Sequence, residues 1–514
     1  PGSVSSIAIN VSCDQPTESG LHQHIVIEDN QFVGTNTESA IQVEGADDVM
    51  IRRNQFDAYK QPLRVEHSTN VHVEDNRGLQ DQAILVSGTL DPSGEYYDWT
   101  QTKKPERPYI HDYSQTLVVK IFLAEKAPDD GCKVYLTFEQ ALEVIRKLDN
   151  LTCGIPKIAY LVGWQFNGHD SKYPSWAEVN PRLKRAQDAT ARDSLCWLMD
   201  EASKYHTTVS LHINMIDATE DSPLWKEYLE KDVIAKDISG QPIKGEVFGD
   251  SPRTDTQSYQ ISYAREWELG LAQKRIDALL AMLPIQKAGT IQIDAFHSMR
   301  PIPHAYPQEK YPELSKDDKR ISPYLDYSLE REVATQRKIY RYFRDRGVDV
   351  TCEGSAYSLR PDAFIGLQPM AWHYNAPAPG IPADLYCGTP MQAEQEITKD
   401  PENLSGLLEQ FCTRVVPWYY ENNKTENKDI PIMRDGSDCC MPLLWKGEKT
   451  LLAYSQNGCN GKTWQLPPSW KHVHRLALSR ITLDGPHDTG SLKVKNHHFT
   501  LTLEKGEAVI MVPK

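Results

Sequence analysis

The chain has 514 residues, too many for one compact domain, and this length favours about three domains. Asp and Glu outnumber Lys and Arg by 71 to 56, so the formal charge is −15, which argues against a nucleic acid or an anionic membrane surface as partner. Hydrophobic residues make up 39% of the chain, enough to exclude disorder as its main state. No apolar run reaches the roughly 18 residues that a membrane-spanning helix needs.

The first 80 residues carry a repeat of short strands. Asn30, Asn54 and Asn76 each follow a strand with alternating apolar side chains, at spacings of 24 and 22 residues, and further strands lie at 41–43 and 63–65. A strand, a corner marked by Asn and another strand resemble the rungs of a right-handed parallel β-helix. We expect the Asn side chains to stack and to satisfy backbone groups at the corners. Because about three rungs are few for such an array, we expect the chain to begin inside a longer β-helix.

From about residue 118, strands alternate with helices. The apolar patterns predict strands at 157–164, 208–213, 290–296 and 348–354, with weaker candidates at 362–370 and 384–390. They predict helices at 193–205, 263–283, 325–345 and 404–420, and a long polar excursion at 217–256. Thr137 with Gln140 predicts a capping box for the helix before the first clear strand. This number of alternating units predicts a (β/α)8 barrel.

After about residue 440 the helices end. Short strands broken by Gly, Asn and Pro predict a small antiparallel β-sandwich. The expected organisation is therefore β-helix rungs at 1–90, a linker at 91–117, a catalytic barrel at 118–435 and a β-sandwich at 436–514. The ten cysteines include no C-x-x-C pair, so we interpret them as buried thiols, with a disulfide between Cys439 and Cys440 as the less favoured alternative.

Polar and aromatic residues follow the predicted barrel strands, and barrel active sites lie at such carboxyl ends. These residues are Trp164, Asn167, His169, Asp170, His212, Asn214, Asp294, His297, Glu353, Trp372, His373 and Asn375. Each one alone is more simply a helix cap or a structural side chain, so the hypothesis of a site depends on five strand ends converging. Asp294 and Glu353 each follow an apolar strand, which places both carboxylates at the barrel mouth.

Two opposed carboxylates near aromatic rings suit glycoside hydrolysis. One carboxylate attacks the anomeric carbon and the other protonates the leaving oxygen, while aromatic faces contact the sugar. His169, Asp170 and His212 lack the H-x-H and H-E-x-x-H spacings of catalytic metal sites, so we predict no catalytic metal and no other cofactor, and leave a structural calcium open. The chain has no Gly-rich phosphate loop and no G-x-S-x-G elbow.

The stretch G-W-Q-F-N-G-H-D-S-K-Y-P, followed by V-N-P-R-L, resembles a signature of the endo-α-N-acetylgalactosaminidases of glycoside hydrolase family 101. It is similarly close to the α-N-acetylgalactosaminidases of family 129. L-H-I-N, I-Q-I-D-A-F, V-T-C-E-G and A-W-H-Y-N then follow in the family's order, so the resemblance covers about residues 155–375.

This resemblance implies a retaining hydrolase that acts on α-linked N-acetylgalactosamine or a related galacto-configured sugar. By position, Asp294 matches the family nucleophile, Glu353 the acid/base and Asp170 a carboxylate that holds sugar hydroxyls, while His212 and Asn214 match substrate contacts. Two features depart from the pattern. Asp217 stands where the family tends to show Glu, and the N-terminal repeat is not typical of the family, so another α-galactoside as substrate stays open.

The sequence therefore predicts a secreted or periplasmic retaining glycoside hydrolase whose partner is a glycan or polysaccharide, without nucleic acid or a membrane span. Pro1 is neither Met nor part of a signal peptide, so we expect a processed start. One alternative is a non-catalytic carbohydrate-binding protein with a decayed site. Another is a lyase or galactosidase built on the β-helix, with charged groups at its corners: Glu28, Asp29, Arg52, Arg53, Glu74 and Asp75.

Two expectations about geometry follow. The Asp294 and Glu353 carboxyl groups should lie about 5 to 5.5 Å apart, the spacing of retaining enzymes. His169, Asp170 and Asn214 should converge on one sugar subsite, with His297 and His373 nearby and an aromatic floor from Trp164 or Trp372.

Overall fold

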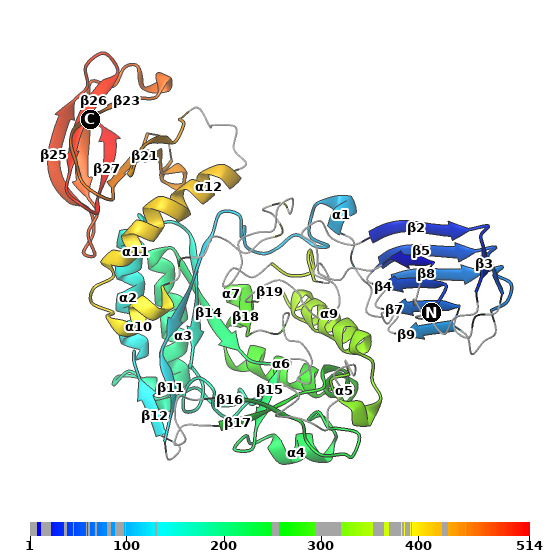
Figure 1. Cartoon of the computed structure of the whole chain (residues 1–514). Helices are drawn as coiled ribbons and strands as arrows, with labels where there is room; N and C mark the ends of the chain where they lie inside the picture. Colours follow the sequence, from blue (N-terminus) through cyan, green and yellow to red (C-terminus); the bar gives the residue numbers. More distant parts are fainter. Residues whose placement is uncertain are drawn as a thin grey trace.

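The structure is a computed structural model of residues 1–514. It describes residues 8–11, 22–34, 39–44, 46–57, 59, 62–66, 69–79, 84–87, 97, 99–128, 131–248, 256–294, 296, 320–352, 364–369, 382, 385, 391, 393–423, 430–447 and 449–514. Figure 1 shows three parts: parallel strands at the N-terminal end, a central α/β region, and antiparallel strands at the C-terminal end.

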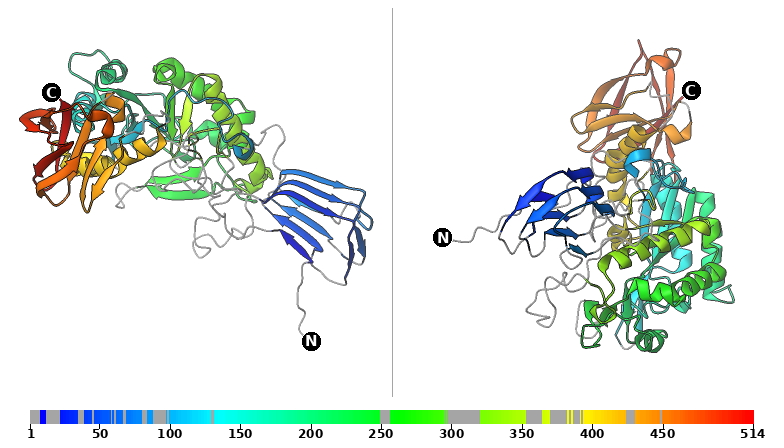
Figure 2. Two further views of the ribbon diagram at one scale, coloured as in Figure 1. Left: turned by 90° about the horizontal axis from the view of Figure 1, so that it is seen from above. Right: turned by 90° about the vertical axis from the view of Figure 1, so that its right-hand side faces the viewer.

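The N-terminal part consists of stacked parallel strands at the predicted repeat. One sheet holds β2 (His22–Glu28), β5 (Ala46–Arg52) and β8 (Thr69–Glu74), and a second holds β1 (Ile9–Val11), β4 (Ile41–Glu44), β7 (Leu63–Glu66) and β9 (Ile84–Ser87). β3 (Gln31–Val33) pairs in parallel with β6 (Gln55–Asp57). Figure 2 shows these strands running side by side. Alternating apolar side chains fill the space between the sheets, and the rings of Phe32 and Phe56 stack at 5.0 Å.

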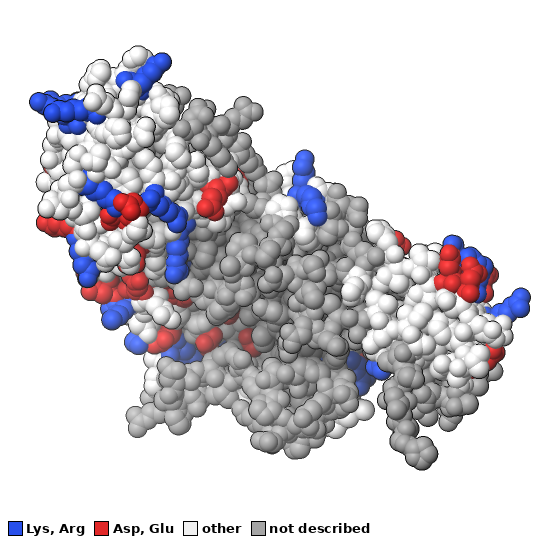
Figure 3. Space-filling model, turned by 45° about the horizontal axis from the view of Figure 1, so that its top comes forward, with Lys and Arg blue, Asp and Glu red and all other residues white. Residues whose placement is uncertain are grey.

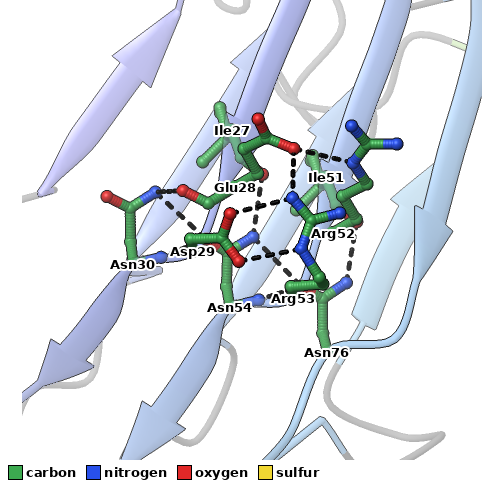
Figure 4. A network of polar contacts seen from close by, with 9 residues as sticks. All are labelled: Ile27, Glu28, Asp29, Asn30, Ile51, Arg52, Arg53, Asn54 and Asn76. Carbon is green, nitrogen blue, oxygen red and sulfur yellow. Dashed lines mark hydrogen bonds and ion pairs between the residues drawn. The ribbon is translucent and has the colours of Figure 1, made fainter.

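A ladder of Asn side chains marks one corner of each turn of the chain. The Asn54 side-chain amide donates to the carbonyl of Ile27 at 2.9 Å, and its oxygen accepts from the backbone N–H of Asn30 at 3.1 Å (Figure 4). Asn76 repeats both contacts one turn on, with Ile51 and Asn54. The predicted stacking is confirmed, and each Asn side chain bonds to backbone groups of the adjacent turn.

The charged residues beside this ladder pair with one another across adjacent turns. Arg52 lies 2.7 Å from Glu28, and Arg53 lies 2.6 Å from Glu28 and 2.8 Å from Asp29. The bonds from Arg52 and Arg53 lower the pKa of the Glu28 carboxyl. Figure 3 shows acidic and basic side chains side by side at this end of the molecule. The four charges therefore serve contacts between turns, which favours a structural interpretation over the carboxylate and cation of a lyase.

Five parallel strands in chain order form the central sheet: β10 (Leu117–Phe122), β13 (Lys157–Val162), β14 (Thr207–Ile213), β18 (Thr290–Ile293) and β19 (Asp349–Thr351). The four predicted strands are present; β13, β18 and β19 are shorter than predicted, and β14 begins one residue earlier. All six residues of β13 are buried, as expected for a parallel strand covered on both faces. Of the two weaker candidates, residues 364–369 contain only an isolated bridge, and the other lies almost wholly outside the described residues.

Helices connect these strands. They include α2 (Phe138–Leu151), α3 (Ala191–Glu201), α5 (Tyr263–Glu268), α6 (Leu271–Met282) and α9 (Leu329–Asp345). The predicted capping box is confirmed, since Thr137 and Gln140 exchange side-chain and backbone hydrogen bonds at 2.9 and 3.3 Å. The helix predicted at 263–283 is two helices, because Gly270 adopts a left-handed φ of 70° between them.

The helix predicted at 404–420 has an interruption that the sequence explains. It comprises α11 (Ser405–Gln410), a π-helical turn (Phe411–Val415) and α12 (Val416–Asn422). Pro417 is the second residue of α12 and has no backbone N–H to donate to the preceding turn. A widened turn before a proline accommodates this lost hydrogen bond.

The described residues of the polar excursion between β14 and α5 form an insertion with its own secondary structure. It contains α4 (Trp225–Glu230) and a three-stranded antiparallel sheet of β15 (Asp217–Thr219), β17 (Thr256–Gln260) and β16 (Lys244–Phe248). The backbone N–H of Thr219 donates to the carbonyl of Tyr173 at 2.9 Å. The insertion is therefore attached to the loop that follows β13.

The C-terminal part is the predicted antiparallel sandwich. Six strands form one sheet in the order β20 (Met433–Asp435), β21 (Asp438–Pro442), β22 (Leu451–Ser455), β27 (Glu507–Pro513), β24 (Arg475–Arg480) and β25 (His487–Lys493). β23 (Cys459–Gln465) pairs with β26 (His498–Leu503) opposite them. Cys439 and Cys440 are buried free thiols, so the alternative of a disulfide between them is wrong.

Candidate active site

Two glycines shape the loop that follows β13. Gly163 and Gly168 have φ values of 75° and 110°, and a Cβ on Gly163 would lie 1.9 Å from the carbonyl oxygen of Ala124. The backbone N–H of His169 donates to that same carbonyl at 2.8 Å. Only glycine allows this close approach together with these torsion angles. The loop therefore folds back over the neighbouring strand and brings His169 and Asp170 to the carboxyl end of the sheet.

His169 and Asp170 lie together over a buried tyrosine. His169 Nε2 is 3.4 Å from Asp170 Oδ1, and its Nδ1 is 3.1 Å from the hydroxyl of Tyr173. The same hydroxyl accepts from the backbone N–H of Asp170 at 3.3 Å. Burial raises the pKa of Tyr173 well above its usual range, so the phenol stays protonated. The Asp170 side chain keeps 31% of its surface exposed, which leaves it accessible to a ligand.

Asp294 follows β18 and lies beside His212 of the adjacent strand. Its backbone N–H donates to the carbonyl of Ile213 at 2.8 Å, which continues the sheet pairing for one more residue. Asp294 Oδ1 lies 3.5 Å from Nε2 of His212, whose ring is in edge contact with the ring of His169 at 5.6 Å. His212 is 3% exposed, whereas Asp294 is 21% exposed. The partly exposed carboxylate of Asp294 thus lies beside the buried imidazole of His212.

Asn214 uses its side chain to fix the loop after β14. Its oxygen accepts from the backbone N–H groups of Ile216 and Asp217 at 2.8 and 2.9 Å, and its nitrogen donates to the Asp217 carboxyl at 2.8 Å. Three of its hydrogen-bonding positions are therefore occupied inside the protein, and the residue is buried. The predicted role as a substrate contact is not supported by this position, which assigns Asn214 to holding the loop.

Trp164 does not supply an aromatic floor. It is fully buried, and its indole N–H donates to the carbonyl of His212 at 3.0 Å. A ring without exposed surface cannot contact a sugar directly, so the prediction for Trp164 needs correction: it supports the end of β14. The other predicted site residues, His297, Glu353, Trp372 and His373, lie outside the described residues, as does Asn375.

Asp217 is a third carboxyl group of this region, and the sequence analysis did not count it among the site residues. Its pKa is raised to about 7, chiefly by burial and to a smaller extent by the negative charges of Asp294 and Asp170, while the hydrogen bond from Asn214 opposes the rise. The signal that could have found it is its spacing, because an Asn three residues before an Asp suits a side-chain-capped turn. Asp217 is thus a proton-holding group next to the proposed catalytic carboxylate.

The raised pKa of Asp217 predicts a pH-dependent contribution to stability. The folded state holds this proton more tightly than an unfolded Asp with a pKa of 3.8, so the contribution is present below about pH 4 and is lost as the pH rises to about 7. Asp217→Asn carries no charge at this position. The melting temperature of the variant should therefore increase relative to that of the wild type as the pH rises from about 4 to about 7. Thermal unfolding between about pH 4 and pH 8 measures the difference.

Asp221→Asn is a control of opposite sign. Burial would raise the pKa of Asp221, but bonds from Lys126 and Thr219 outweigh it and lower the pKa. That variant should be less stable than the wild type across the same interval. A constant difference between Asp217→Asn and the wild type from about pH 4 to 7 would contradict the assignment.

The described residues contain no group of three or more His, Cys, Asp or Glu side chains arranged to hold a metal ion. The arrangement brings a partly exposed carboxylate, a His–Asp pair and a buried carboxyl with a raised pKa together at the end of a parallel sheet. Carboxylates at the carboxyl ends of β/α strands are typical of glycoside hydrolases with barrel folds.

Comparison with known proteins agrees with this class. Residues 131–305 match the family model of the endo-alpha-N-acetylgalactosaminidases, glycoside hydrolase family 101. The match includes His169, Asp170, His212, Asp217 and Asp294. It confirms, for this region, the resemblance predicted from the sequence. No curated protein matches the sequence.

Solved structures with similar folds include glycosidases at low identity. The alpha-N-acetylgalactosaminidase NagBb from Bifidobacterium bifidum is 12% identical in its ligand-free form, with a TM-score of 0.34 over 47% of this chain and 36% of that one. Its GalNAc complex is 10% identical, with a TM-score of 0.39 over 66% and 56%. The GH36 alpha-galactosidase AgaB from Geobacillus stearothermophilus is 11% identical, with a TM-score of 0.38 over 79% and 56%. The chain thus spans little more than a third of the length of ligand-free NagBb.

Proposed function

We propose that the chain is a retaining glycoside hydrolase that cleaves α-linked N-acetylgalactosamine, or a related α-galactoside, from glycans or polysaccharides. The observation that carries the proposal is the position of Asp294. This carboxylate ends β18 inside the region that matches family 101, is partly exposed, and lies 3.5 Å from a buried histidine. The His169–Asp170 pair next to it supplies polar groups for sugar hydroxyls.

In the proposed double displacement, an Asp294 oxygen attacks the anomeric carbon while the bond from that carbon to the leaving oxygen breaks. Glu353 gives its proton to the leaving oxygen, and then takes a proton from the water that hydrolyses the glycosyl ester. A proton on Nε2 of His212 would face Asp294 and favour its ionised form. The reaction uses carboxyl groups and water alone, so we propose that it needs no cofactor.

The proposal also includes a closed barrel and a parallel β-helix. We infer that the five parallel strands are part of a closed (β/α)8 barrel and that β1–β9 are rungs of a parallel β-helix, because their pairings follow the chain order expected of each fold. Among the described residues, no helix combines the length and apolar character needed to cross a membrane. A glycan substrate agrees with secretion or a cell-surface location.

The test is turnover of aryl glycosides. The full chain should release the phenol from aryl α-N-acetylgalactosaminide or aryl α-galactoside, and NMR of the first-formed sugar should show the α-anomer. Release of the β-anomer would overturn the retaining mechanism. Saturable binding of these sugars without any turnover would favour the non-catalytic alternative.

Asp170→Asn tests the substrate-holding role. Asn tolerates the left-handed φ of 57° found at this position, so the fold should be retained. Loss of one charged hydrogen-bond acceptor should lower kcat/KM on the order of 10- to 100-fold. Glu178→Gln is a suitable control, because this carboxylate is exposed at the end of the same loop. Unchanged kinetics in Asp170→Asn would remove Asp170 from the site.

A further inference from the structure

Tyr173 lies buried beneath the loop that carries His169 and Asp170. It is 1% exposed, so a substrate cannot reach its hydroxyl. The backbone turns sharply above it, because Asp170 and Lys172 adopt left-handed φ values of 57° and 58°. The backbone carbonyl of Tyr173 accepts from the N–H of Thr219 at 2.9 Å, which attaches the residue to the neighbouring insertion. Tyr173 is therefore held from two sides of the site.

The Tyr173 hydroxyl has one proton to donate, and its surroundings decide where this proton points. Burial raises the pKa of the phenol well above its usual range, and the negative charges of Asp170, Asp294 and Asp217 add to the rise, so the phenol keeps its proton. The hydroxyl oxygen accepts from the backbone N–H of Asp170 at 3.3 Å, and Nδ1 of His169 lies 3.1 Å from the same oxygen. The phenol can donate to Nδ1 only if Nδ1 itself carries no proton.

The opposite nitrogen of the His169 ring faces a carboxylate. Nε2 lies 3.4 Å from Oδ1 of Asp170, a distance at which an N–H group attracts the carboxylate and a bare lone pair repels it. In a neutral imidazole one nitrogen carries the proton, and the hydrogen bond made by the other nitrogen sets which one it is. A proton on Nε2 and an acceptor at Nδ1 suit both neighbours, whereas the reverse tautomer places a lone pair against the carboxylate.

We infer that Tyr173 is a positioning residue that fixes His169 as the Nε2–H tautomer and thereby orients Asp170 toward the substrate. Three contacts then form a closed ring: the Asp170 N–H to the Tyr173 oxygen, the Tyr173 proton to His169 Nδ1, and His169 Nε2–H to the Asp170 carboxylate. Polar groups linked in this way polarise one another. The inference deepens the proposed function, in which Asp170 holds sugar hydroxyls, and it rests on that function only for its effect on turnover.

NMR of the full chain labelled with ¹⁵N in its histidines tests the tautomer without any need for turnover. At mildly alkaline pH, where ordinary imidazoles are neutral, the spectra distinguish a protonated ring nitrogen from an acceptor, and His169→Phe assigns the His169 signals by their loss. We expect a protonated Nε2 and an unprotonated Nδ1 in the wild type. Tyr173→Phe removes only the hydroxyl and should lose this preference, while unchanged signals from the other histidines show that the fold is retained. A protonated Nδ1 in the wild type, or an unchanged tautomer in Tyr173→Phe, would overturn the inference.

Kinetics on aryl glycosides test the effect of Tyr173 on catalysis. Tyr173→Phe should lower kcat/KM about 2- to 10-fold, as expected for one neutral hydrogen bond, and by less than Asp170→Asn does. Because Tyr173 acts through His169, Tyr173→Phe should cause no further loss in a His169→Phe background. An equal loss in both backgrounds would overturn the action through His169.

Tyr113→Phe is the matched control. Tyr113 is also 1% exposed, and its hydroxyl donates to Thr290 at 2.9 Å, at the opposite end of the strand that precedes Asp294. This variant should keep the His169 tautomer and the kcat/KM of the wild type. The same change of tautomer in Tyr113→Phe would overturn the specific role of Tyr173. Absence of turnover by the wild type would refute the proposed glycosidase, and the tautomer spectra would still decide the inference.

Discussion

Asp294→Ala is expected to lose essentially all turnover, on both natural glycans and activated aryl glycosides. The proposed nucleophile forms the covalent bond to the anomeric carbon, and no leaving group can replace that step. We expect kcat to fall on the order of 10⁴-fold or more. The side chain is partly exposed, and its backbone N–H keeps the bond to Ile213, so the variant should fold.

Covalent labelling gives a second test of Asp294 as the nucleophile. A fluorinated glycoside that traps the glycosyl-enzyme should label the wild type on the peptide that contains Asp294, and should leave Asp294→Ala unlabelled in mass spectra. Asp221→Asn serves as the control, since this carboxylate is held by Lys126 at 2.7 Å in the neighbouring insertion and should retain activity. Substantial turnover by Asp294→Ala, or a label on another residue, would refute the assignment.

The sequence was sufficient to locate the strands of the central sheet to within a few residues. Isoleucines at alternate positions from Thr290 to Ile293, with a carboxylate directly after them, indicate both a strand and its polar end. The Asn repeat could also be read from the sequence, because each corner depends on an Asn side chain that bonds to the adjacent turn, at the similar separations of 27 and 25 residues.

Side-chain direction and pairing between distant segments could not be predicted in the same way. Trp164 and His169 both follow β13, yet only one of them reaches the strand ends, because the glycine-dependent path over Ala124 decides the direction. The contact of His212 with Asp294 depends on the register of β14 with β18, in which His212 lies opposite Gln292. Such register is set by the assembled sheet and leaves no local pattern.

The insertion at 217–260 shows the same limit. Its polar composition predicts only a segment outside the alternating strands and helices. In the structure, β15 and β16 both pair with β17, which lies well over 30 residues beyond Asp217. This pairing buries Asp217 and so sets its pKa, which a sequence pattern cannot report.

Glu353→Ala should depend on the leaving group, in contrast to Asp294→Ala. A sugar alcohol leaves only when it is protonated, whereas an activated phenol needs little help. We therefore propose that this variant loses far more activity on natural glycans than on aryl glycosides, for which a fall on the order of 10²-fold or less is expected in the bond-breaking step. Azide should partly restore the aryl reaction by attacking the glycosyl ester of Asp294, and the product should be the α-glycosyl azide.

Steady-state kinetics on both substrate types, with NMR of the azide product, separate the two roles. Equal impairment on both substrates, without rescue by azide, would place the acid elsewhere, and Asp217, with a pKa of about 7 next to Asp294, would be the carboxyl to test in its place.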